Sequence, residues 1–414
     1  RYSRRPMSPP DSLSSLSTAA SDRQRKILLA LSLLLIACNL RPVFGSLSVV
    51  LPEIMRDTGL SAAGASLLTT LPILCLGLFS APTPWLSRRF GAERVLLLAL
   101  LLIGSGTLLR AMGSLPFLFA SAVLAGAGIA MGNVLLPSLV KRHFAQHAAL
   151  MTGMYILAIC MGATIATAST VPLATNLFAG AWPYALAVWA LPALLVLALW
   201  LPQALRMQTE TIDPAARSGS LGRDALAWQV TAFMGLQSSL AYIVIGWLAP
   251  ILRERGLESD LAGYVVAIST LSQLVTSLVV PSIAARCRDQ RALAVGLTAL
   301  SCMALMGLIL APLSTVWLWA LLLGCGQGGL FALALSLIVM RSGNAQVTAQ
   351  LSAMAQGWGY MLAAFGPLLT GLLHQWTGSF ASSIWLIALL SAAMAWSGWG
   401  AGRNLLVRPA AGAQ

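Results

Sequence analysis

Charged residues are scarce in this chain. Only 9% of its 414 residues are charged and only 12 are Asp or Glu, whereas a soluble globular domain has about 25% charged residues. This composition excludes an ordinary water-soluble protein. Apolar residues make up 58% of the chain, enough for about twelve membrane spans of about 20 residues each. The composition therefore predicts a polytopic membrane protein.

Paired cysteines and histidine clusters are also missing. The six cysteines show no paired spacing, and all but Cys287 lie inside apolar runs, so we expect neither a disulfide nor a cysteine metal site. The three histidines, His143, His147 and His374, lie near the ends of apolar runs. His143 and His147 are four residues apart, but no Cys, Asp or Glu lies next to them in the sequence to complete a metal site. We expect no metal and no cofactor.

The hydrophobic stretches predict an all-α membrane protein with twelve transmembrane helices in two six-helix bundles. We expect residues 1–22 to be a disordered tail, because they are rich in Ser, Pro and Arg. A charged central loop at 203–226 divides the bundles 23–202 and 227–403, and 404–414 is a short tail. The predicted spans are 27–51, 61–84, 92–112, 115–139, 148–174, 180–202, 227–252, 261–284, 291–311, 314–340, 347–374 and 380–402.

Basic residues are distributed unevenly about the predicted membrane. Twenty of the 25 Lys and Arg residues lie on the side of the two termini. Cytoplasmic loops carry the excess of Lys and Arg, so we expect both termini in the cytoplasm, at a bacterial-type inner membrane. The net charge of +13 then orients the chain, and we expect no nucleic-acid partner. The remaining basic residues are Arg56, Arg110, Arg253 and Arg255 on the other side and Arg41 within a span.

Three patterns repeat between the two halves. The sequence Pro, four residues, Arg, four residues, Arg occurs at 84–94 and 281–291, a Gly-x-Gly pair at 126–128 and 324–326, and a similar opening of a span at 150–154 and 350–354. The offset stays near two hundred residues, so we predict an internal duplication.

This organisation resembles the major facilitator superfamily of secondary transporters. The basic turn after the second span, Leu86-Ser-Arg-Arg-Phe-Gly91, fits that family, although Arg88 stands where the family usually has Asp. Segments 39–42, 235–250 and 351–367 are similar to the branch of cyanate and 2-nitroimidazole transporters. The resemblance implies alternating access between two six-helix halves.

Arg41 is the most informative candidate for substrate binding. It lies near the middle of the first span, where a charge costs about 2.5–3.5 kcal/mol even on the mildest scale. No Asp or Glu lies inside any predicted span away from its ends. The structural alternative, an ion pair, therefore has no obvious partner, and we expect Arg41 to face a central cavity. Pro42 should loosen the helix beside it.

Neutral polar and aromatic residues at similar depth complete the candidate site. Gln356 and Tyr360 are four residues apart and share a helix face. Each glutamine could instead bond to a neighbouring helix, and Trp247 could be an interfacial anchor. The candidate substrate-binding residues are Arg41, Asn39, Gln237, Gln356, Tyr360, Gln327, Tyr242, Trp358, Tyr155 and Trp247.

We therefore expect a secondary active or facilitative transporter of a small polar molecule, an anion such as cyanate or a small carboxylate. The alternative is an exporter of drug-like compounds such as nitroimidazoles. The spans lack the acids and histidines that an enzyme or a carboxylate proton relay would need. We expect a monomer in the lipid bilayer, with a small-molecule substrate and no enzymatic activity.

Overall fold

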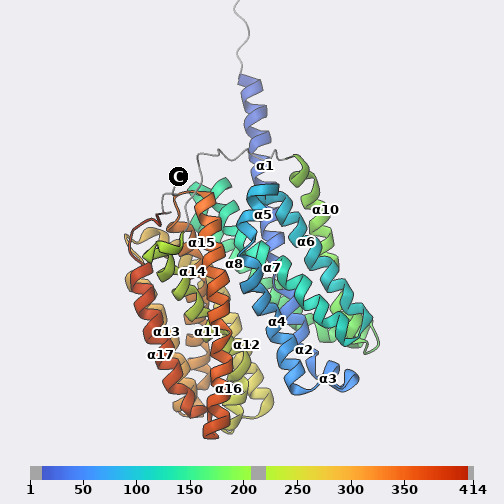
Figure 1. Cartoon of the computed structure of the whole chain (residues 1–414), viewed down its shortest axis with the longest axis vertical. Helices are drawn as coiled ribbons and strands as arrows, with labels where there is room; N and C mark the ends of the chain where they lie inside the picture. Colours follow the sequence, from blue (N-terminus) through green and yellow to red (C-terminus); the bar gives the residue numbers. More distant parts are fainter. Residues whose placement is uncertain (1–11, 207–220, 409–414) are drawn as a thin grey trace, which may run out of the picture.

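The computed structural model describes residues 12–206 and 221–408, which form helices joined by turns and short irregular segments, with no β-strand among them. Two groups of long helices lie side by side, one from each half of the chain (Figure 1). The described part of the N-terminal half ends at Arg206, and that of the C-terminal half begins at Leu221. We call the end of the molecule where these two residues lie the linker end. The all-α, two-half architecture predicted from the sequence is confirmed.

The N-terminal half contains ten α-helices, and several of the expected spans are divided in two. The first span is α1 and α2, the second is α4 and α5, and the sixth is α9 and α10. The bounds are α1 Ser12–Cys38, α2 Pro42–Val49, α3 Leu51–Thr58, α4 Ala62–Ser80, α5 Thr83–Phe90, α6 Ala92–Leu108, α7 Leu115–His143, α8 Ala148–Pro172, α9 Trp182–Ala187 and α10 Ala190–Arg206.

The C-terminal half is more regular. Five of its six expected spans are single helices, and the remaining one is divided at Ala364. The bounds are α11 Ala225–Glu254, α12 Ser259–Arg286, α13 Arg291–Leu310, α14 Val316–Met340, α15 Ala345–Ala363, α16 Phe365–Thr377 and α17 Ser383–Ala401. Short helical turns link several of these helices in both halves, among them η1 Leu109–Met112, η5 Leu221–Arg223 and η7 Phe380–Ser382.

Fewer helices qualify as independent spans than the twelve that the sequence predicted. Within the described residues ten are long and apolar enough, and the bent pair α4–α5 raises this number to eleven. The expected span 347–374 is not among them, because it breaks between α15 and α16. The polar residues Gln346, Gln350 and Gln356 also lower the hydropathy of α15.

The first helix begins earlier than expected. The predicted disordered tail covers residues 1–22, yet 12–22 are the first turns of α1. No Gly or Pro interrupts 12–38, so this stretch can extend the helix formed by the apolar span. Residues 1–11, most of the central loop and the last residues of the chain lie outside the described part.

The two Gly-x-Gly pairs play equivalent packing roles. A Cβ at Gly126 would lie 2.8 Å from the Cβ of Cys75 in α4, and one at Gly128 would lie 2.5 Å from the carbonyl oxygen of Ala99 in α6. In the other half, Gly324 and Gly326 pack in the same way against α12 and α13. Each pair therefore lets the fourth span of its half approach the second and third closely, as the predicted duplication requires.

A polar contact at the linker end also occurs once in each half. In the N-terminal half, Arg142 forms a 3.1 Å ion pair with Glu93. In the C-terminal half, Arg341 is buried and donates to the side-chain oxygen of Gln290 and, at 2.9 Å, to the carbonyl of Ala401. Equivalent positions thus connect the third span to the fourth in each half. The contact is an ion pair in the N-terminal half and an arginine–glutamine hydrogen bond in the C-terminal half.

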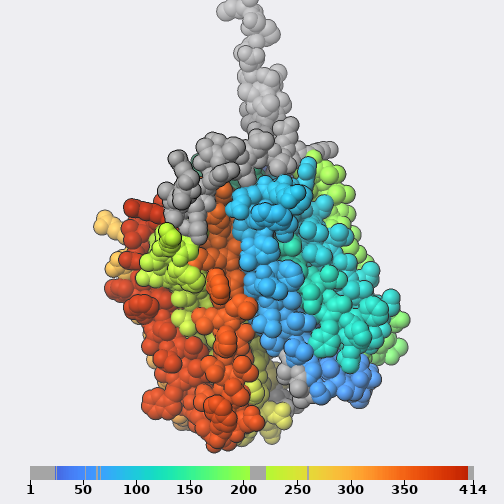
Figure 2. Space-filling model, viewed as in Figure 1, coloured from blue at the N-terminus to red at the C-terminus, as the bar shows by residue number. Residues whose placement is uncertain are grey.

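The two halves touch through α4, α5, α7 and α8 on one side and α12, α14 and α15 on the other. Figure 2 shows the seam where α4, in blue, meets α15, in orange. Glycines permit close contact near the linker end: a Cβ at Gly153 would lie 2.9 Å from the carbonyl oxygen of Leu278, and one at Gly77 would lie 3.1 Å from that of Gly357. The halves are therefore packed together toward the linker end.

Candidate functional site

The first span is broken where the sequence places its arginine. Helix α1 ends at Cys38, α2 begins at Pro42, and Arg41 is the residue that caps the start of α2. Proline supplies no backbone N–H and clashes with the preceding turn, which weakens the helix at this point. Other helices here continue through a proline, such as α7 at Pro137, so Pro42 contributes to the break without causing it alone. The break places the backbone and side chain of Arg41 at a helix end inside the bundle.

Helix α8 packs tightly against this break. A Cβ at Gly162 would collide with the carbonyl oxygen of Cys38, and a Cβ at Gly45 in α2 would lie 2.8 Å from the carbonyl oxygen of Ala163. Only glycine fits at such approaches, because a side chain would displace backbone atoms. The position of Arg41 is therefore fixed from both sides of the break by α8.

Aromatic residues from both halves surround the guanidinium of Arg41. Its Cζ atom lies 5.7 Å from the ring centroid of Phe44 and 5.7 Å from that of Phe331 in α14, within the range of cation–π attraction. The guanidinium also interacts with the hydroxyl groups of Tyr242 in α11 and Tyr360 in α15. We call these five residues the Arg41 group.

The Arg41 group contains a cation without a carboxylate. Arg41 is partly exposed, and none of the ion pairs among the described residues includes it. A guanidinium presents a planar fork of donors that matches a carboxylate or a similar planar anion. The group can therefore supply the charge and the hydrogen bonds that a small anion needs.

Two further candidates adjoin this group. Tyr155 in α8 is buried and coupled electrostatically to Tyr360. Gln356, one turn before Tyr360, donates to the backbone carbonyl of Asn133 in α7 over 2.9 Å and to the hydroxyl of Ser352 over 2.8 Å. The structure thus brings Arg41, Tyr242, Tyr360, Tyr155 and Gln356 together at the junction of the two halves.

The other neutral polar candidates form local hydrogen bonds. Asn39 donates to the carbonyl of Leu35 over 2.8 Å, at the end of α1. The amide of Gln237 donates to Ser238 over 2.7 Å, and that of Gln327 donates to Ser301 in α13 over 3.0 Å. Gln327 is thereby engaged with a neighbouring helix of its own half rather than with the Arg41 group.

The two tryptophan candidates lie elsewhere. Trp358 is 63% exposed and packs against Trp228, with ring centroids 6.2 Å apart. Trp247 donates to the carbonyl of Pro367 over 2.9 Å and packs against Phe380. Trp358 therefore lies on the outer surface of the bundle, and Trp247 connects α11 to α16 and the turn that follows it.

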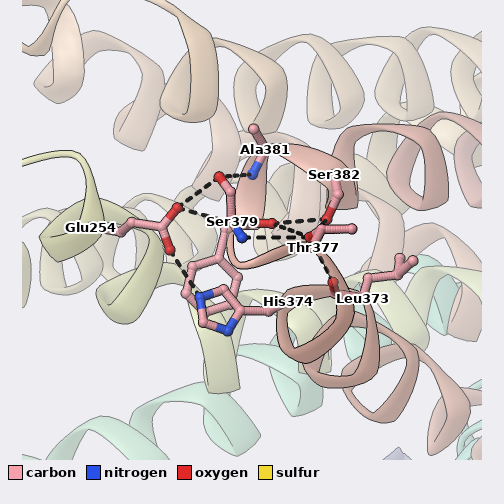
Figure 3. Close-up of polar contacts among 8 residues, drawn as sticks. Glu254, Leu373, His374, Thr377, Ser379, Ala381 and Ser382 are labelled. Atoms are coloured by element: carbon pink, nitrogen blue, oxygen red, sulfur yellow. Dashed lines mark hydrogen bonds and ion pairs between the residues drawn. The ribbon is translucent and has the colours of Figure 1, made fainter.

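A polar cluster fastens the end of the C-terminal half that is remote from the linker (Figure 3). One carboxylate oxygen of Glu254 accepts from the Ser379 hydroxyl over 2.9 Å and the Phe380 N–H over 3.0 Å. The other oxygen lies 3.0 Å from Nε2 of His374. The His374 ring is stacked on Phe380 at 3.9 Å. All these residues belong to one half, so the cluster holds α11, α16 and η7 together.

Sequence reasoning missed three residues around the break. Phe44 could have been found, because it lies one helical turn after Arg41, whereas nothing local indicates that Phe331 approaches from the other half. Arg110 was assigned to the far membrane side, yet it is 1% exposed. It donates to the hydroxyl of Ser121 over 2.9 Å and the carbonyl of Val43 over 3.1 Å, and so anchors α2 to α7.

Comparisons with known proteins agree with this geometry. Residues 27–364 match the family model described as Major Facilitator Superfamily. The chain is 38% identical to the 2-nitroimidazole transporter of Escherichia coli (strain K12) over 95% of this chain and 99% of that protein. It is 31% identical to the cyanate transport protein CynX of the same organism, over 84% of this chain and 91% of that protein.

A solved structure shares the fold at low sequence identity. The proton:xylose symporter XylE superposes with a TM-score of 0.70 over 93% of this chain and 97% of that one, at 16% identity. This likeness confirms the arrangement of the helices and says nothing of the substrate. The chain belongs to the major facilitator superfamily of transporters, in the branch that contains the cyanate and 2-nitroimidazole transporters.

Proposed function

We propose that this protein moves a small anion, of the size of cyanate or a small carboxylate, across a bacterial-type inner membrane by alternating access. The observation that carries the proposal is Arg41, a guanidinium inside the bundle with no carboxylate beside it among the described residues. An unpaired charge at this depth is costly, and a bound anion would offset that cost.

The composition of the Arg41 group supports alternating access. Arg41 and Phe44 come from the N-terminal half, and Phe331, Tyr242 and Tyr360 come from the C-terminal half. Rocking of one half against the other would therefore expose the same residues to each side in turn. We assign the linker end to the cytoplasm, because the connections there carry most of the basic residues. The packed linker end then corresponds to a state closed toward the cytoplasm.

Movement of a nitroimidazole is the second candidate function. It is favoured by the 38% identity to a protein named a 2-nitroimidazole transporter. A nitro group is planar and carries partial negative charge on two oxygens, so it could approach Arg41 as a carboxylate does, although more weakly. The two functions therefore differ in how strongly they depend on the charge of Arg41.

Uptake into proteoliposomes tests the proposal. The purified protein is reconstituted, and the initial uptake of labelled cyanate, acetate, benzoate and 2-nitroimidazole is measured for the parent, Arg41→Ala, Arg41→Lys and the exposed control Arg286→Ala. We expect saturable anion uptake that falls at least tenfold in Arg41→Ala and less in Arg41→Lys, with the control unchanged. Anion uptake that is unaffected by Arg41→Ala would overturn the role of Arg41. Saturable uptake of 2-nitroimidazole alone would favour the second candidate.

A further inference from the structure

A basic turn at the linker end occurs once in each half and takes no part in the Arg41 group. It follows the second span, where α5 leads into α6 and α12 leads into α13, and α5 can be seen at the linker end in Figure 1. The turn contains the repeated pattern Pro, four residues, Arg, four residues, Arg. Its arginines are Arg88, Arg89 and Arg94 in the N-terminal half and Arg286, Arg288 and Arg291 in the C-terminal half.

Little negative charge balances these two turns. Glu93 pairs with Arg142 of α7 over 3.1 Å. Asp289 has a carboxylate oxygen 3.8 Å from Nε of Arg291, too far for a hydrogen bond. The ion pairs among the described residues include none of the other five arginines of the turns. Both turns therefore present uncompensated positive charge at the same end of the molecule.

In each turn one arginine lies over an exposed tryptophan ring. The Cζ atom of Arg89 is 5.5 Å from the ring centroid of Trp85 and 5.6 Å from that of Phe90. In the other half, Cζ of Arg291 is 5.3 Å from the ring centroid of Trp399 in α17. Trp85 is 50% exposed and Trp399 is 52% exposed. Cation–π attraction thus holds one guanidinium of each half at the outer surface of the bundle.

The hydrogen-bond donors of these two guanidinium groups are unused. Within the described residues the side chain of Arg89 forms no hydrogen bond or ion pair, and Nε of Arg291 is buried without a hydrogen-bond partner. A guanidinium that stacks by its face keeps its N–H groups at its edge. That edge matches the oxygens of a phosphate, which it can bind through two parallel hydrogen bonds.

Apolar surface adjoins both charges. Phe90, beside Arg89, is exposed, and so is Trp396, about one turn before Trp399 on α17. Tryptophan is enriched at the level of the lipid headgroups, and anionic lipids of the cytoplasmic leaflet attract basic residues near the membrane surface. A free phosphate would contact only the charged part of such a surface. A phospholipid would contact both parts, with its phosphate on the arginine and its acyl chains on the rings.

We propose that each half carries a binding site for an anionic phospholipid at the linker end. The headgroup phosphate binds the guanidinium of Arg89 in one site and that of Arg291 in the other, and the acyl chains lie along the neighbouring exposed rings. We call these the Arg89 site and the Arg291 site. Bound lipid holds α5 and α13 at the level of the headgroups. Neither site depends on Arg41 or on the substrate.

Native mass spectrometry of the full chain, released from an uncharged detergent, tests these sites. The protein is titrated with phosphatidylglycerol, with phosphatidylcholine and with inorganic phosphate. The variants are Arg89→Gln, Arg291→Gln, their combination and the control Arg253→Gln, an exposed arginine at the opposite end of the molecule. We expect the parent and the control to bind two phosphatidylglycerol molecules at least fivefold more tightly than phosphatidylcholine. Each single variant should keep one such site, and the double variant should keep neither.

Lysine variants separate two defined sites from a general attraction between lipid and a basic surface. Arg89→Lys combined with Arg291→Lys keeps the charge but loses the planar fork of donors, and we expect it to bind phosphatidylglycerol at least threefold more weakly than the parent. Parental affinity in either double variant would overturn the sites, as would binding of inorganic phosphate as tight as that of the lipid. The Tm in lipid-free detergent shows that each variant is folded. Anion uptake enters none of these measurements, so a failure of the proposed function would leave them unchanged.

Discussion

The side-chain amide of Gln356 donates a 2.9 Å hydrogen bond to the backbone carbonyl of Asn133. This bond joins α15 in the C-terminal half to α7 in the N-terminal half, one helical turn before Tyr360. A movement that separates the halves toward the linker end would have to break it. The bond therefore belongs to the conformation seen here, and its removal should change how long the protein stays in that conformation.

Replacing Gln356 should favour opening toward the linker end. A buried neutral hydrogen bond contributes about 1 kcal/mol, so Gln356→Ala should shift the equilibrium about fivefold. The measurement is the maleimide labelling rate of a cysteine placed at Ser80, a buried residue beside Gly357, in an otherwise cysteine-free protein. Gln327→Ala is the matched control, because it removes a glutamine bonded within one half. Equal labelling rates in both variants would contradict the role of the bond.

A methyl group at Gly162 should disturb the break in the first span. Its Cβ would collide with the carbonyl oxygen of Cys38, and overpacking of this kind typically costs about 1–3 kcal/mol. We expect Gly162→Ala to lower the Tm measured in detergent and to reduce anion uptake. Gly246→Ala is the control, because a Cβ at Gly246 meets nothing within 4 Å. A Gly162→Ala protein as stable and active as the parent would show that α8 does not constrain Arg41.

Arg110 should act on the site through α2. Its guanidinium donates to Val43, Ser46 and Ser121, and hydrogen bonds from a charged donor contribute about 1.5–3 kcal/mol each. We expect Arg110→Ala to lower the free energy of unfolding by about 3 kcal/mol and to raise the KM for the anion. Arg110→Lys should be intermediate in both, since it keeps the charge but not the fork of donors. A stability loss with an unchanged KM would restrict Arg110 to a structural role.

Acidification should loosen α3 through Asp57. Hydrogen bonds from Arg56 and Trp182 hold the pKa of the Asp57 carboxyl below its ordinary value. A carboxyl with a lowered folded-state pKa contributes stability above its unfolded pKa, and that contribution disappears as the pH falls through the folded pKa. The Tm of the parent should therefore decline below about pH 4 more than that of Asp57→Asn. Identical pH profiles would show that these bonds do not stabilise the protein.

The sequence was sufficient to predict the architecture because several of its features indicate the same arrangement. Twelve apolar stretches, the uneven distribution of Lys and Arg, and repeats such as the Gly126–Gly128 and Gly324–Gly326 pairs all point to two related halves. The divided spans were harder to predict, although Pro42 did indicate the break beside Arg41. The 53° bend between α4 and α5 has a local cue in Pro82 and Pro84, which lie at the break, but the size of the bend depends on tertiary packing.

The candidate site could be predicted only where the residue itself is unusual. Arg41 is costly within a span whatever surrounds it, so its position alone marked it. Gln327 and Trp358 have no such property, because an amide or an indole in a span has the same sequence signature whichever way it faces. Arg110 was missed because it lies at the end of a span, where a charge ordinarily reaches water. For Gln327, Trp358 and Arg110 alike, the surroundings of the side chain depend on how the helix is rotated about its axis, and tertiary packing sets that rotation.

Equilibrium binding is the most direct test of the role of Arg41, because it does not depend on transport. Labelled benzoate and labelled cyanate are titrated against the purified parent, Arg41→Gln and the control Arg286→Gln, each checked for folding by its Tm. We expect saturable binding of at least one anion to the parent and the control, weakened at least tenfold in Arg41→Gln. Unchanged anion binding in a folded Arg41→Gln protein would contradict this role.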